Sequence, residues 1–547
     1  MINNTLGDIF KFAPVYVSLQ QLLTYSKIER LSNYGQPQEA FLYSVITAWK
    51  NTEEYKNMLL ADRYFQNKAD IIDRTRKTPS DGLLEDDPYL TNTKLLHPFF
   101  YKLTRQKVNY IFSKPLSIST ENKEFEEELK FYFNKDLNRI IKNRGKEAII
   151  KGKSWLYVYY DENNKLSFRT VPSEEIKPFW ADDEHTKLDA VARSYSIIDY
   201  GVKGEPKQIC YVEFFTNEGI WKYEQTTTGL KLVRTEYIDE NGIKQVEPNP
   251  RPYFSGKTME QKTRTIKDEE GNEIEETYEE EVTKDFVWNK VPWICFKYNE
   301  EEMSLLEFIK SMIDDYDTNT SDVSNFLQDV PNSIKVISNY GGEDLGEFNA
   351  NIRKYRAVIV EGDGGLSSIN TPIDSASYET HLNRLRKDIY DFASGVDTQS
   401  TDLGNASGQA LKFRYADLDL DANYMINEFN AALNDLLWFI KVDILARYGH
   451  DHFEDEVTFV FNTDMIVNEE TTIENAKNSV GLISDKTIVA NHPWVINVEE
   501  ELKQMQKEKE EAQEQFDITA MNNTNEDDDD DDDDADEDEN VEPDDEN

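Results

Sequence analysis

The sequence predicts an α+β fold in which a β region separates two helical regions. Two observations lead to this prediction. Apolar residues recur at threes and fours up to about residue 150 and again from residue 304, whereas they alternate every second residue from 154. The first spacing is typical of helices that bury one face, and the second of half-buried strands. Strands and helices that are segregated along the chain are typical of an α+β fold. The 547 residues suffice for about two to four compact units.

The first 150 residues are predicted to be mostly helical. Residues 1–37 show no clear pattern and stay unassigned. A long helix is expected over 38–65, and a loop over 75–92, because two prolines and a glycine interrupt any regular element there. Three further helices are expected over 95–112, 123–133 and 137–150.

The β region begins where the apolar period changes to two. Strands are predicted over 154–160 and 166–171, and a meander of strands over 188–240. Residues 256–285 are highly charged. We expect them to form a hairpin excursion on the rim of the β region.

From residue 304 the helical period returns and the elements become longer. A helix with one apolar stripe is predicted over 304–327, and Pro331 ends it. A polar loop over 395–406 precedes the longest predicted helix, 407–448, which would span roughly 60 Å if straight. The remaining elements are a small strand–helix–strand unit over 331–375, a helix over 377–393, a strand over 457–461, and helices over 472–479, 484–490 and 498–515.

The chain is strongly acidic, and its charge is unevenly placed. The formal net charge is −47, and removing the 17 acidic residues between Glu526 and Asn547 leaves −30 on residues 1–525. Such a chain repels nucleic-acid phosphates at long range, so any DNA that it handles must slide past it. The tail is too charged and too poor in apolar residues to fold. It is either a DNA-mimicking or partner-repelling appendage or a segment that only aids solvation.

Composition also argues against several classes of protein. The sequence has no run of about 18 apolar residues, as a membrane-spanning helix requires. Its first residues lack the basic and apolar segments of a secretory signal. Cys210 and Cys295 are too few for a disulfide framework or a cysteine-based zinc site. We expect a protein of a reducing compartment.

Candidate nucleotide-binding motifs are incomplete. Gly152-Lys153-Ser154 and Gly256-Lys257-Thr258 each match the end of a phosphate-binding loop. Glu147 and Arg251 occupy the positions where that loop needs a further glycine. We therefore expect ordinary turns at both places.

Two groups of potential metal ligands are equally incomplete. Asp417, Asp419 and Asp421 resemble a calcium loop without its glycine, and their place in a predicted helix favours a solvated acidic face. His450 and His452 follow a predicted helix without a visible third ligand nearby. We expect no catalytic residue, no cofactor and no metal site, and the protein is predicted not to be an enzyme.

Charge complementarity between two predicted helices suggests self-association. Residues 301–329 contain eight acidic residues against one base, whereas the helix 377–393 is basic at its centre. An acidic helix beside a basic helix of a neighbouring copy would be favourable, and a ring is one way to arrange this. A monomeric hairpin with its charges in water is the alternative. The acidic face would comprise Glu307, Asp314, Asp315 and Asp322, and the basic face Arg384, Arg386 and Lys387.

Several short motifs occur in a particular order along residues 38–515. They are EYKNM (54–58), RYFQNKADI (63–71), VNYIFSKP (108–115), IKG (150–152) before WLYVYY (155–160), VP (171–172) with IKP (176–178), KVP (290–292), and ASGV (393–396) leading to SG (407–408). In this order, the motifs and elements resemble the portal proteins of tailed bacteriophages, in the family of long-tailed phages of Gram-positive hosts. The order is more specific than any single motif.

This resemblance implies a portal-type subunit with an α/β wing, a two-helix stem, a small α/β clip, a long kinked tunnel helix and a helical crown, assembling as a ring of twelve. The implied segments are an unassigned N-terminal segment (1–37), the wing (38–300, with the excursion 256–285), stem helix 1 (301–330), the clip (331–375), stem helix 2 (376–394), the tunnel loop (395–406), the tunnel helix (407–450), a wing return strand (451–470), the crown helices (471–515) and a disordered acidic tail (516–547).

The resemblance further implies a channel at one capsid vertex, through which double-stranded DNA is packaged by the terminase motor and later ejected. The other implied partners are a head-completion adaptor and the major capsid and scaffolding proteins, with no membrane. DNA would pass without sequence specificity. The implied location is the virion, after assembly in the host cytoplasm.

The resemblance also implies roles for individual residues. The implied DNA-facing residues are Asp397, Thr398, Gln399, Ser400, Thr401 and Asp402. Lys412 and Arg414 are candidates for transient phosphate contacts. The implied motor and adaptor interface of the clip comprises Glu343, Asp344, Glu347, Asn351 and Lys354.

Two other interpretations stay open from the sequence. An acidic soluble scaffold or nucleic-acid mimic would act through its poly-Asp tail and lose activity without residues 526–547, whereas a portal would still form rings. A nuclease that uses Asp clusters and Mg²⁺ would lose a metal-dependent activity when Asp417 and Asp421 are replaced together.

Overall fold

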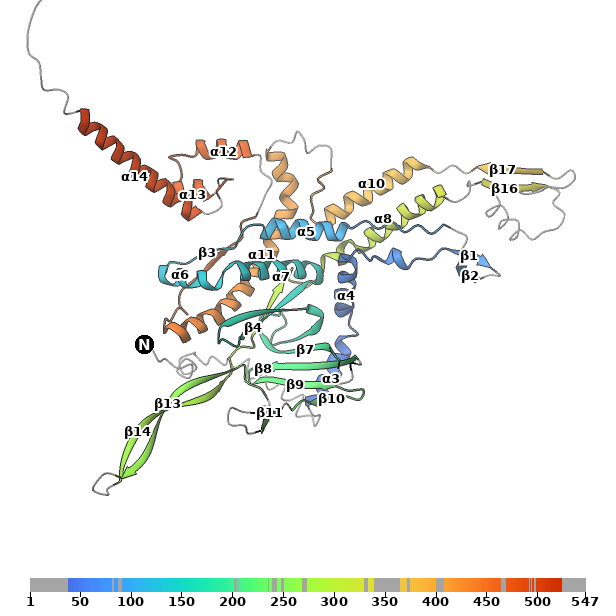
Figure 1. Ribbon diagram of the computed structural model, residues 1–547. Helices are drawn as coiled ribbons and strands as arrows, with labels where there is room; N and C mark the ends of the chain where they lie inside the picture. Colours follow the sequence, from blue (N-terminus) through green and yellow to red (C-terminus); the bar gives the residue numbers. More distant parts are fainter. Residues whose placement is uncertain are drawn as a thin grey trace, which may run out of the picture. The chain divides into compact units, whose positions relative to one another are not determined.

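Figure 1 shows the computed structural model of the chain. The structure describes residues 38–80, 83–86, 91–200, 204, 206–234, 236–238, 244–246, 250–267, 273–328, 333–338, 365–370, 374–399, 408–463, 469–490, 492, 494–495 and 498–523. Residues 1–37, the interior of the expected clip (339–364) and most of the expected tail (524–547) lie outside this set. The chain divides into two compact units, which we describe separately. The large unit comprises Met1–Leu403 and Phe413–Met465, and the small unit comprises Gly404–Lys412 and Ile466–Asn547.

The N-terminal part of the large unit is helical, but the single helix expected over 38–65 is wrong. α3 (Gln38–Trp49) and α4 (Glu53–Phe65) are separated at Thr52, whose backbone is extended. The Thr52 hydroxyl accepts a hydrogen bond from the Tyr55 N–H at 3.3 Å and so caps α4. The apolar spacing continues across this cap, so it does not reveal the break. The helices that follow are α5 (Phe99–Phe112), α6 (Lys123–Tyr132) and α7 (Lys135–Lys151).

The segment between α4 and α5 contains more regular structure than the loop predicted over 75–92. α5 begins at Phe99 rather than at residue 95, because Pro98 disfavours helical backbone in the residue before it. The intervening elements are η1 (Asp70–Asp73) and an antiparallel hairpin of β1 (Lys77–Ser80) and β2 (Leu83–Asp86).

Two antiparallel sheets form the β region, with strand orders β15-β4-β5 and β10-β9-β8-β7-β6. The predicted meander is confirmed from Leu188 to Leu232. β4 lies between β5, which follows it directly in the sequence, and β15, which lies more than 120 residues further along the chain. The strands are β4 (Lys153–Tyr160), β5 (Leu166–Val171), β6 (Ile176–Trp180), β7 (Leu188–Asp199), β8 (Lys207–Thr216), β9 (Gly219–Gln225), β10 (Leu230–Leu232) and β15 (Trp293–Lys297).

The charged excursion is a long hairpin, as predicted. β13 (Phe254–Lys267) pairs along its whole length with β14 (Glu273–Phe286). Figure 1 shows this hairpin reaching away from the two sheets. A smaller hairpin of β11 (Glu236–Ile238) and β12 (Lys244–Val246) precedes it.

Long helices occupy the second helical region close to their predicted limits. α8 (Leu305–Gln328) and α10 (Ser375–Phe392) run side by side, and the strand pair β16 (Ser333–Ser338) and β17 (Gly365–Asn370) lies between them in the sequence (Figure 1). α11 (Gly408–Tyr448) is one continuous helix. The chain then returns to the N-terminal helices, where β18 (Thr458–Val460) pairs with β3 (Ser117–Ser119).

The small unit contains α12 (Glu469–Asn478), α13 (Asp485–Ala490) and α14 (Val498–Asn523). α14 continues past residue 515, so the expectation that disorder begins at 516 is wrong for residues 516–523. These eight residues contain neither glycine nor proline, and the run of aspartates begins only after them.

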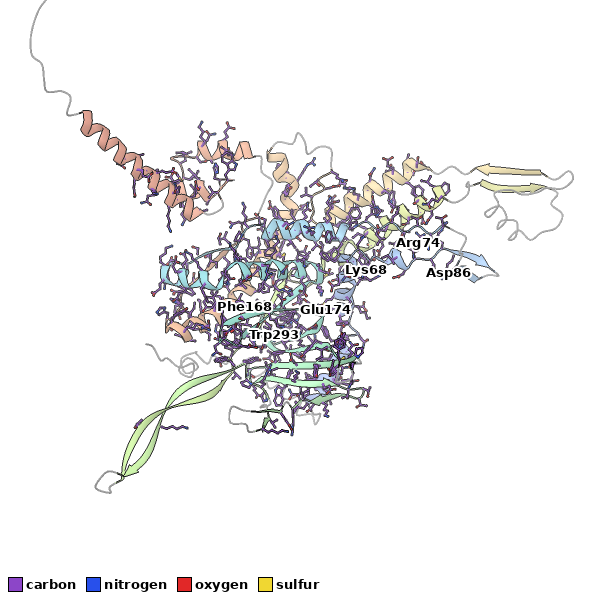
Figure 2. The ribbon with its side chains drawn as sticks, viewed as in Figure 1. Lys68, Arg74, Asp86, Phe168, Glu174 and Trp293 are labelled. Carbon is purple, nitrogen blue, oxygen red and sulfur yellow. The ribbon has the colours of Figure 1, made fainter. Side chains whose placement is uncertain are left out.

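Side chains fill the interior of the large unit (Figure 2). One continuous cluster of buried apolar residues joins α5, α7, β4, β15, α8 and α11, and it includes Trp155, Ile309 and Phe429. A second, smaller cluster packs α3 against the five-stranded sheet through Leu42 and Ile46. The combination of helical and antiparallel sheet structure confirms the α+β class.

Candidate functional site

The candidate site is the region where α5, α8 and α10 meet the start of the polar loop 395–406. An extended segment that precedes α5 lies along α8. Three buried polar side chains, four residues apart on α8, accept hydrogen bonds from alternate backbone N–H groups of this segment. Four helical residues advance about 6 Å and two extended residues about 6.6 Å, so the two spacings match. The pairs are Asp317 with His97 (3.0 Å), Ser321 with Leu95 (3.0 Å) and Asn325 with Thr93 (2.6 Å).

Asp317 is the charged member of this row. Its carboxylate also contacts the Nδ1 atom of His97 at 2.7 Å. Burial raises the pKa of Asp317, and the interaction with His97 opposes that shift. The row of polar side chains thus fixes the position of α8 along the extended segment. The spacing of polar residues within an apolar stripe was the sequence signal that could have identified it.

The four residues predicted to form an acidic face on α8 all have partners within the same chain. Glu307 accepts a hydrogen bond from the Ser304 N–H at 2.9 Å and belongs to the N-terminal cap of α8. Each of the other three contacts a side chain from another part of the chain, and Asp314 also contacts Lys310 of α8 itself. Asp314 contacts Tyr64 (2.5 Å) and Lys310 (2.6 Å), Asp315 contacts His381 (3.1 Å), and Asp322 contacts Arg74 (2.8 and 2.9 Å).

Among the three residues of the predicted basic face, Arg386 has partners at the start of the polar loop. Its guanidinium donates two hydrogen bonds to the Asp397 carboxylate, at 2.7 and 2.9 Å, and a third to Gln399 at 2.9 Å. The hydrogen bonds from Arg386 hold the pKa of Asp397 below its usual range. Two residues predicted to face DNA are therefore tied to α10. Arg384 and Lys387 are exposed.

α5 holds Val396, the residue just before Asp397. The Gln106 side-chain amide donates to the Val396 carbonyl at 2.9 Å and accepts from the Val396 N–H at 3.0 Å. Val396 is itself buried. A side chain that satisfies both backbone groups of one residue fixes that residue in place. The loop therefore begins from a rigid base.

The next residue of α5, Lys107, connects the loop to α11. Its side chain is 1% exposed, and its Nζ atom lies 2.6 Å from Asp421 Oδ2 and 3.4 Å from the Ser394 carbonyl. Tyr298 donates a hydrogen bond to the other Asp421 oxygen at 2.8 Å. Burial lowers the pKa of Lys107, and the charge of Asp421 opposes this shift. The solvated acidic face predicted for α11 is therefore wrong at Asp421.

Asp419 also has a partner on α5, since Tyr110 donates a hydrogen bond to its carboxylate. Consecutive turns of α5 thus bind α11 at two aspartates, while Asp417 is exposed. The sequence could not indicate these contacts, because the paired residues lie about 300 positions apart.

The other predicted site residues are only partly described. Thr398 is exposed, and Arg414 is half-buried in α11. Lys412 also lies in α11, but its side chain is outside the described part. The remaining residues lie outside the described residues: Ser400, Thr401 and Asp402 of the loop, and Glu343, Asp344, Glu347, Asn351 and Lys354 of the expected clip.

Lys153, which belongs to the first incomplete phosphate-binding motif, is committed to ion pairs. Its side chain is 3% exposed and contacts Glu54 at 2.6 Å and also Glu302. Burial would raise the pKa of Glu302, but the charge of Lys153 lowers it to about 2. The second motif lies within the paired strand β13. Gly152 ends α7 directly before β4, so a turn is confirmed there. The turn expected at Gly256-Lys257-Thr258 is wrong, because these residues pair with β14 as part of a long hairpin.

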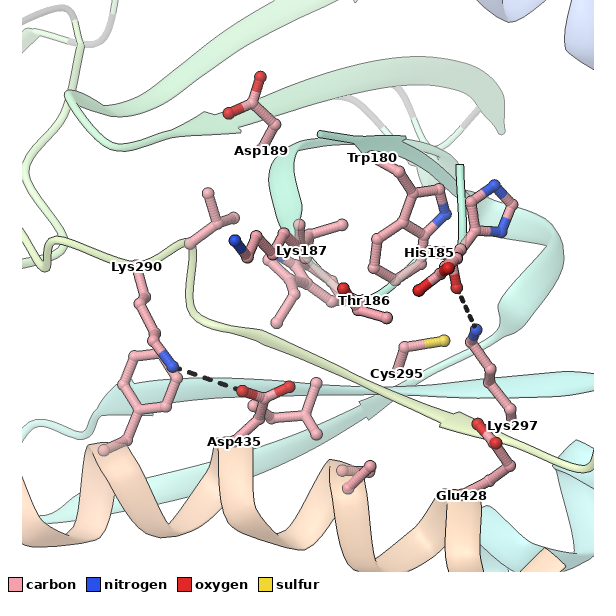
Figure 3. A pocket seen from close by; sticks show the side chains of 18 of the residues that line it. Trp180, His185, Thr186, Lys187, Asp189, Lys290, Cys295, Lys297, Glu428 and Asp435 are labelled. Atoms are coloured by element: carbon pink, nitrogen blue, oxygen red, sulfur yellow. Dashed lines mark hydrogen bonds and ion pairs between the residues drawn. The ribbon is translucent and has the colours of Figure 1, made fainter. Parts of the chain in front are cut away.

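A cavity of about 910 Å³ lies between the β6–β7 connection, β15 and α11 (Figure 3). Trp180, His185 and Cys295 line it, and Lys290 contacts Asp435 at its edge at 3.4 Å. Burial raises the pKa of Asp189, another lining residue, to about 6. No sequence motif indicated this cavity.

The helices within the described ranges include none that is both long and apolar enough to cross a bilayer.

The Arg386 contacts predict a measurable effect on the loop. Replacing Arg386 with glutamine is expected to speed amide hydrogen exchange at Val396–Gln399 about tenfold, because charge-assisted hydrogen bonds are each worth about 1.5–3 kcal/mol. Hydrogen exchange with mass spectrometry on peptides that cover 394–406 measures this. Arg384→Gln is the control, since that side chain is 80% exposed and lies 3.7 Å from Asp388. Equal exchange in the two variants would contradict the anchoring role of Arg386.

Most of the chain matches a known protein family. Residues 48–515 match the family described as phage portal protein, SPP1 Gp6-like. The portal protein of Bacillus phage SPP1 is 28% identical over 459 residues, which cover 82% of this chain and 83% of that protein. The portal protein of Clostridium phage phiCD119 is 28% identical over 466 residues, covering 82% and 91%. A solved structure of the neck of a native GTA particle, computed with C12 symmetry, matches at 10% identity and a TM-score of 0.32, covering 73% of this chain and 90% of that one.

The family match extends over most of the chain and includes every element of the candidate site. It agrees with the family that the sequence motifs indicated. The chain therefore belongs to the phage portal protein family, SPP1 Gp6-like.

Proposed function

We propose that the chain forms the portal of a tailed phage, a ring-shaped channel at one capsid vertex through which double-stranded DNA enters and later leaves. The family match over residues 48–515 is the observation on which this function depends. The protein is a structural channel component and not an enzyme, in keeping with its family and with the names of its relatives. Its place is the portal vertex of the virion.

The proposed parts of the subunit follow the order of the elements. α8 and α10 form the stem, residues 331–375 the clip, and residues 395–406 the tunnel loop. α11 is the tunnel helix, with a kink along its length. The wing comprises residues 38–300 with the return strand in 451–470, and the crown comprises 471–515. Twelve subunits form the ring.

The contacts around α5 support a mechanical role for the loop. Lys107 contacts Ser394 just before the loop, Gln106 holds Val396 at its start, and Arg386 holds Asp397 next to it. A loop fixed at its base can project polar residues toward passing DNA without moving away under load. Thr398 and residues 400–402 are the proposed DNA-facing part.

The negative charge of the chain favours passage of DNA over tight binding of DNA. Each phosphate that a protein neutralises adds affinity through counterion release, so a conduit for DNA must make few such contacts. The net charge of −47 and the pairing of Arg386 with Asp397 meet this requirement. Lys412 and Arg414 remain the proposed points of transient phosphate contact.

The proposed partners supply what the chain lacks. Neither candidate phosphate-binding loop is intact, so a terminase motor provides the energy of packaging. The clip, with Glu343, Asp344, Glu347, Asn351 and Lys354, faces that motor and later a head-completion adaptor. Scaffolding and major capsid proteins surround the ring, which assembles in the host cytoplasm.

Native mass spectrometry with negative-stain class averages tests the proposal. A ring of twelve 63.7 kDa chains has a mass of about 764 kDa and a central hole. The same ring is expected after deletion of residues 526–547. A chain that remains monomeric even with capsid and scaffolding proteins, and that loses partner binding when the tail is deleted, would instead be an acidic interaction protein.

A further inference from the structure

Three side chains with metal-binding atoms meet at one end of the large unit, outside the site described above. Glu128 lies on α6, and His450 and His452 follow the end of α11. His450 Nδ1 lies 2.7 Å from Glu128 Oε1, and His452 Nε2 lies 3.2 Å from Glu128 Oε2. The potential ligand atoms all lie within 4.8 Å of one another. The sequence showed the two histidines but no third ligand, because Glu128 is more than 300 residues away.

The buried part of this cluster is incomplete as a hydrogen-bond network. The His452 side chain is 6% exposed, and its ring stacks on Phe125 at a centroid distance of 4.2 Å. His452 Nε2 and Glu128 Oε2 face each other, but neither has a hydrogen-bond partner among the described residues. A buried polar atom without a partner destabilises the fold. An ion between these two atoms would satisfy both.

The other nitrogen of His452 is held in the manner of a metal ligand. Its Nδ1 atom lies 2.6 Å from Asp455 Oδ2, and Asn122 donates a hydrogen bond to the same Asp455 oxygen at 3.0 Å. Histidines that bind metals usually donate their second ring nitrogen to a carboxylate or carbonyl, which orients the ring. Asn122 is also the N-cap of α6, so the helix that carries Glu128 is tied to the same network.

We propose that Glu128, His450 and His452 bind a divalent transition-metal ion of the zinc class. Two imidazoles and one carboxylate form a ligand set that Zn²⁺ accepts, with a fourth position left for water. Magnesium and calcium prefer sites made only of oxygen atoms and are disfavoured here. The His450 side chain is 42% exposed, so the ion can enter from solvent.

The position of the site indicates a structural role. The ion would join α6 to the segment after α11, close in sequence to the β3–β18 pair that returns the chain to the N-terminal helices. It would therefore hold the end of α11 against α6. This inference is independent of the proposed function, because it concerns the fold of one chain in any oligomeric state.

The test uses the full-length purified protein, stripped with a chelator and then dialysed against ZnCl₂ with MgCl₂ in large excess. The magnesium occupies sites made only of carboxylates, such as those of the acidic tail. We expect one zinc per chain by elemental analysis and a higher temperature of unfolding with zinc than without it. Cobalt in place of zinc should give the visible absorption of a tetrahedral nitrogen–oxygen site.

Glu128→Gln should weaken zinc binding at least about tenfold and abolish the cobalt spectrum. Glu127→Gln is the matched control, because this neighbouring side chain is 74% exposed and contacts Lys130. His450→Gln repeats the test at a partly exposed position if Glu128→Gln does not fold. The proposal is overturned if the wild-type protein retains no stoichiometric zinc, or if folded ligand variants bind zinc as tightly as Glu127→Gln.

Discussion

Replacing Gly152 with alanine is expected to lower the free energy of unfolding of the large unit by more than about 4 kcal/mol. Gly152 ends α7 with φ of +84°, a backbone conformation that costs alanine about 1–2 kcal/mol. The larger cost is steric, since the added Cβ would lie 1.9 Å from the Glu302 carbonyl oxygen. Backbone must move to relieve this contact, and that movement separates Glu302 from Lys153.

Urea denaturation followed by tryptophan fluorescence measures the Gly152 effect, because Trp155 and Trp293 are buried in the same unit. Gly204→Ala is the matched control. Gly204 has φ of +73°, and within the described part of the chain no atom lies within 4 Å of the position that an added Cβ would take. It should therefore show only the backbone cost. Equal losses for the two variants would mean that contact with Glu302 is unimportant.

The second large effect is expected at Lys107. Lys107→Met should lower the free energy of unfolding by about 3–5 kcal/mol, because it leaves the Asp421 carboxylate without its cation in a largely buried place. The double variant Lys107→Met with Asp421→Asn should recover part of this loss, since the amide carries no charge and still accepts the hydrogen bond from Tyr298.

Urea denaturation of the single and double variants forms a double-mutant cycle for this pair. Lys102→Met is the control on the same helix, because its side chain is exposed. A Lys107→Met protein as stable as Lys102→Met would show that the buried ion pair does not stabilise the junction of α5 and α11.

The junction at α5 gives these effects a functional meaning. Gln106 and Lys107 are neighbours on α5, and Tyr110 lies one turn further along. Together they contact the base of the loop and two aspartates of α11. The start of the loop and α11 therefore share one support. Substitutions at this support should disturb both together, whereas a substitution at the exposed Thr398 should leave the support unchanged.

The sequence predicted the elements whose cause is local. The apolar stripe of α8, the limits of α11 and the β13–β14 hairpin follow from spacing and turn residues within short windows. The same reasoning missed the cap at Thr52, because a helix cap depends on one side chain while the apolar pattern around it continues. The resemblance to the portal family came instead from the order of short motifs between residues 54 and 408.

Only the tertiary structure decided which charged residues pair. The sequence indicated an acidic face on α8 and a basic face on α10. In the folded chain, Asp322 forms an ion pair with Arg74, and Arg386 forms one with Asp397. Likewise, the sequence placed His450 near His452, and folding added Glu128. Periodicity is a property of neighbouring residues and can be read along the chain. Ion pairing and metal coordination act over a few ångströms in space, so they depend on contacts between residues that lie hundreds of positions apart.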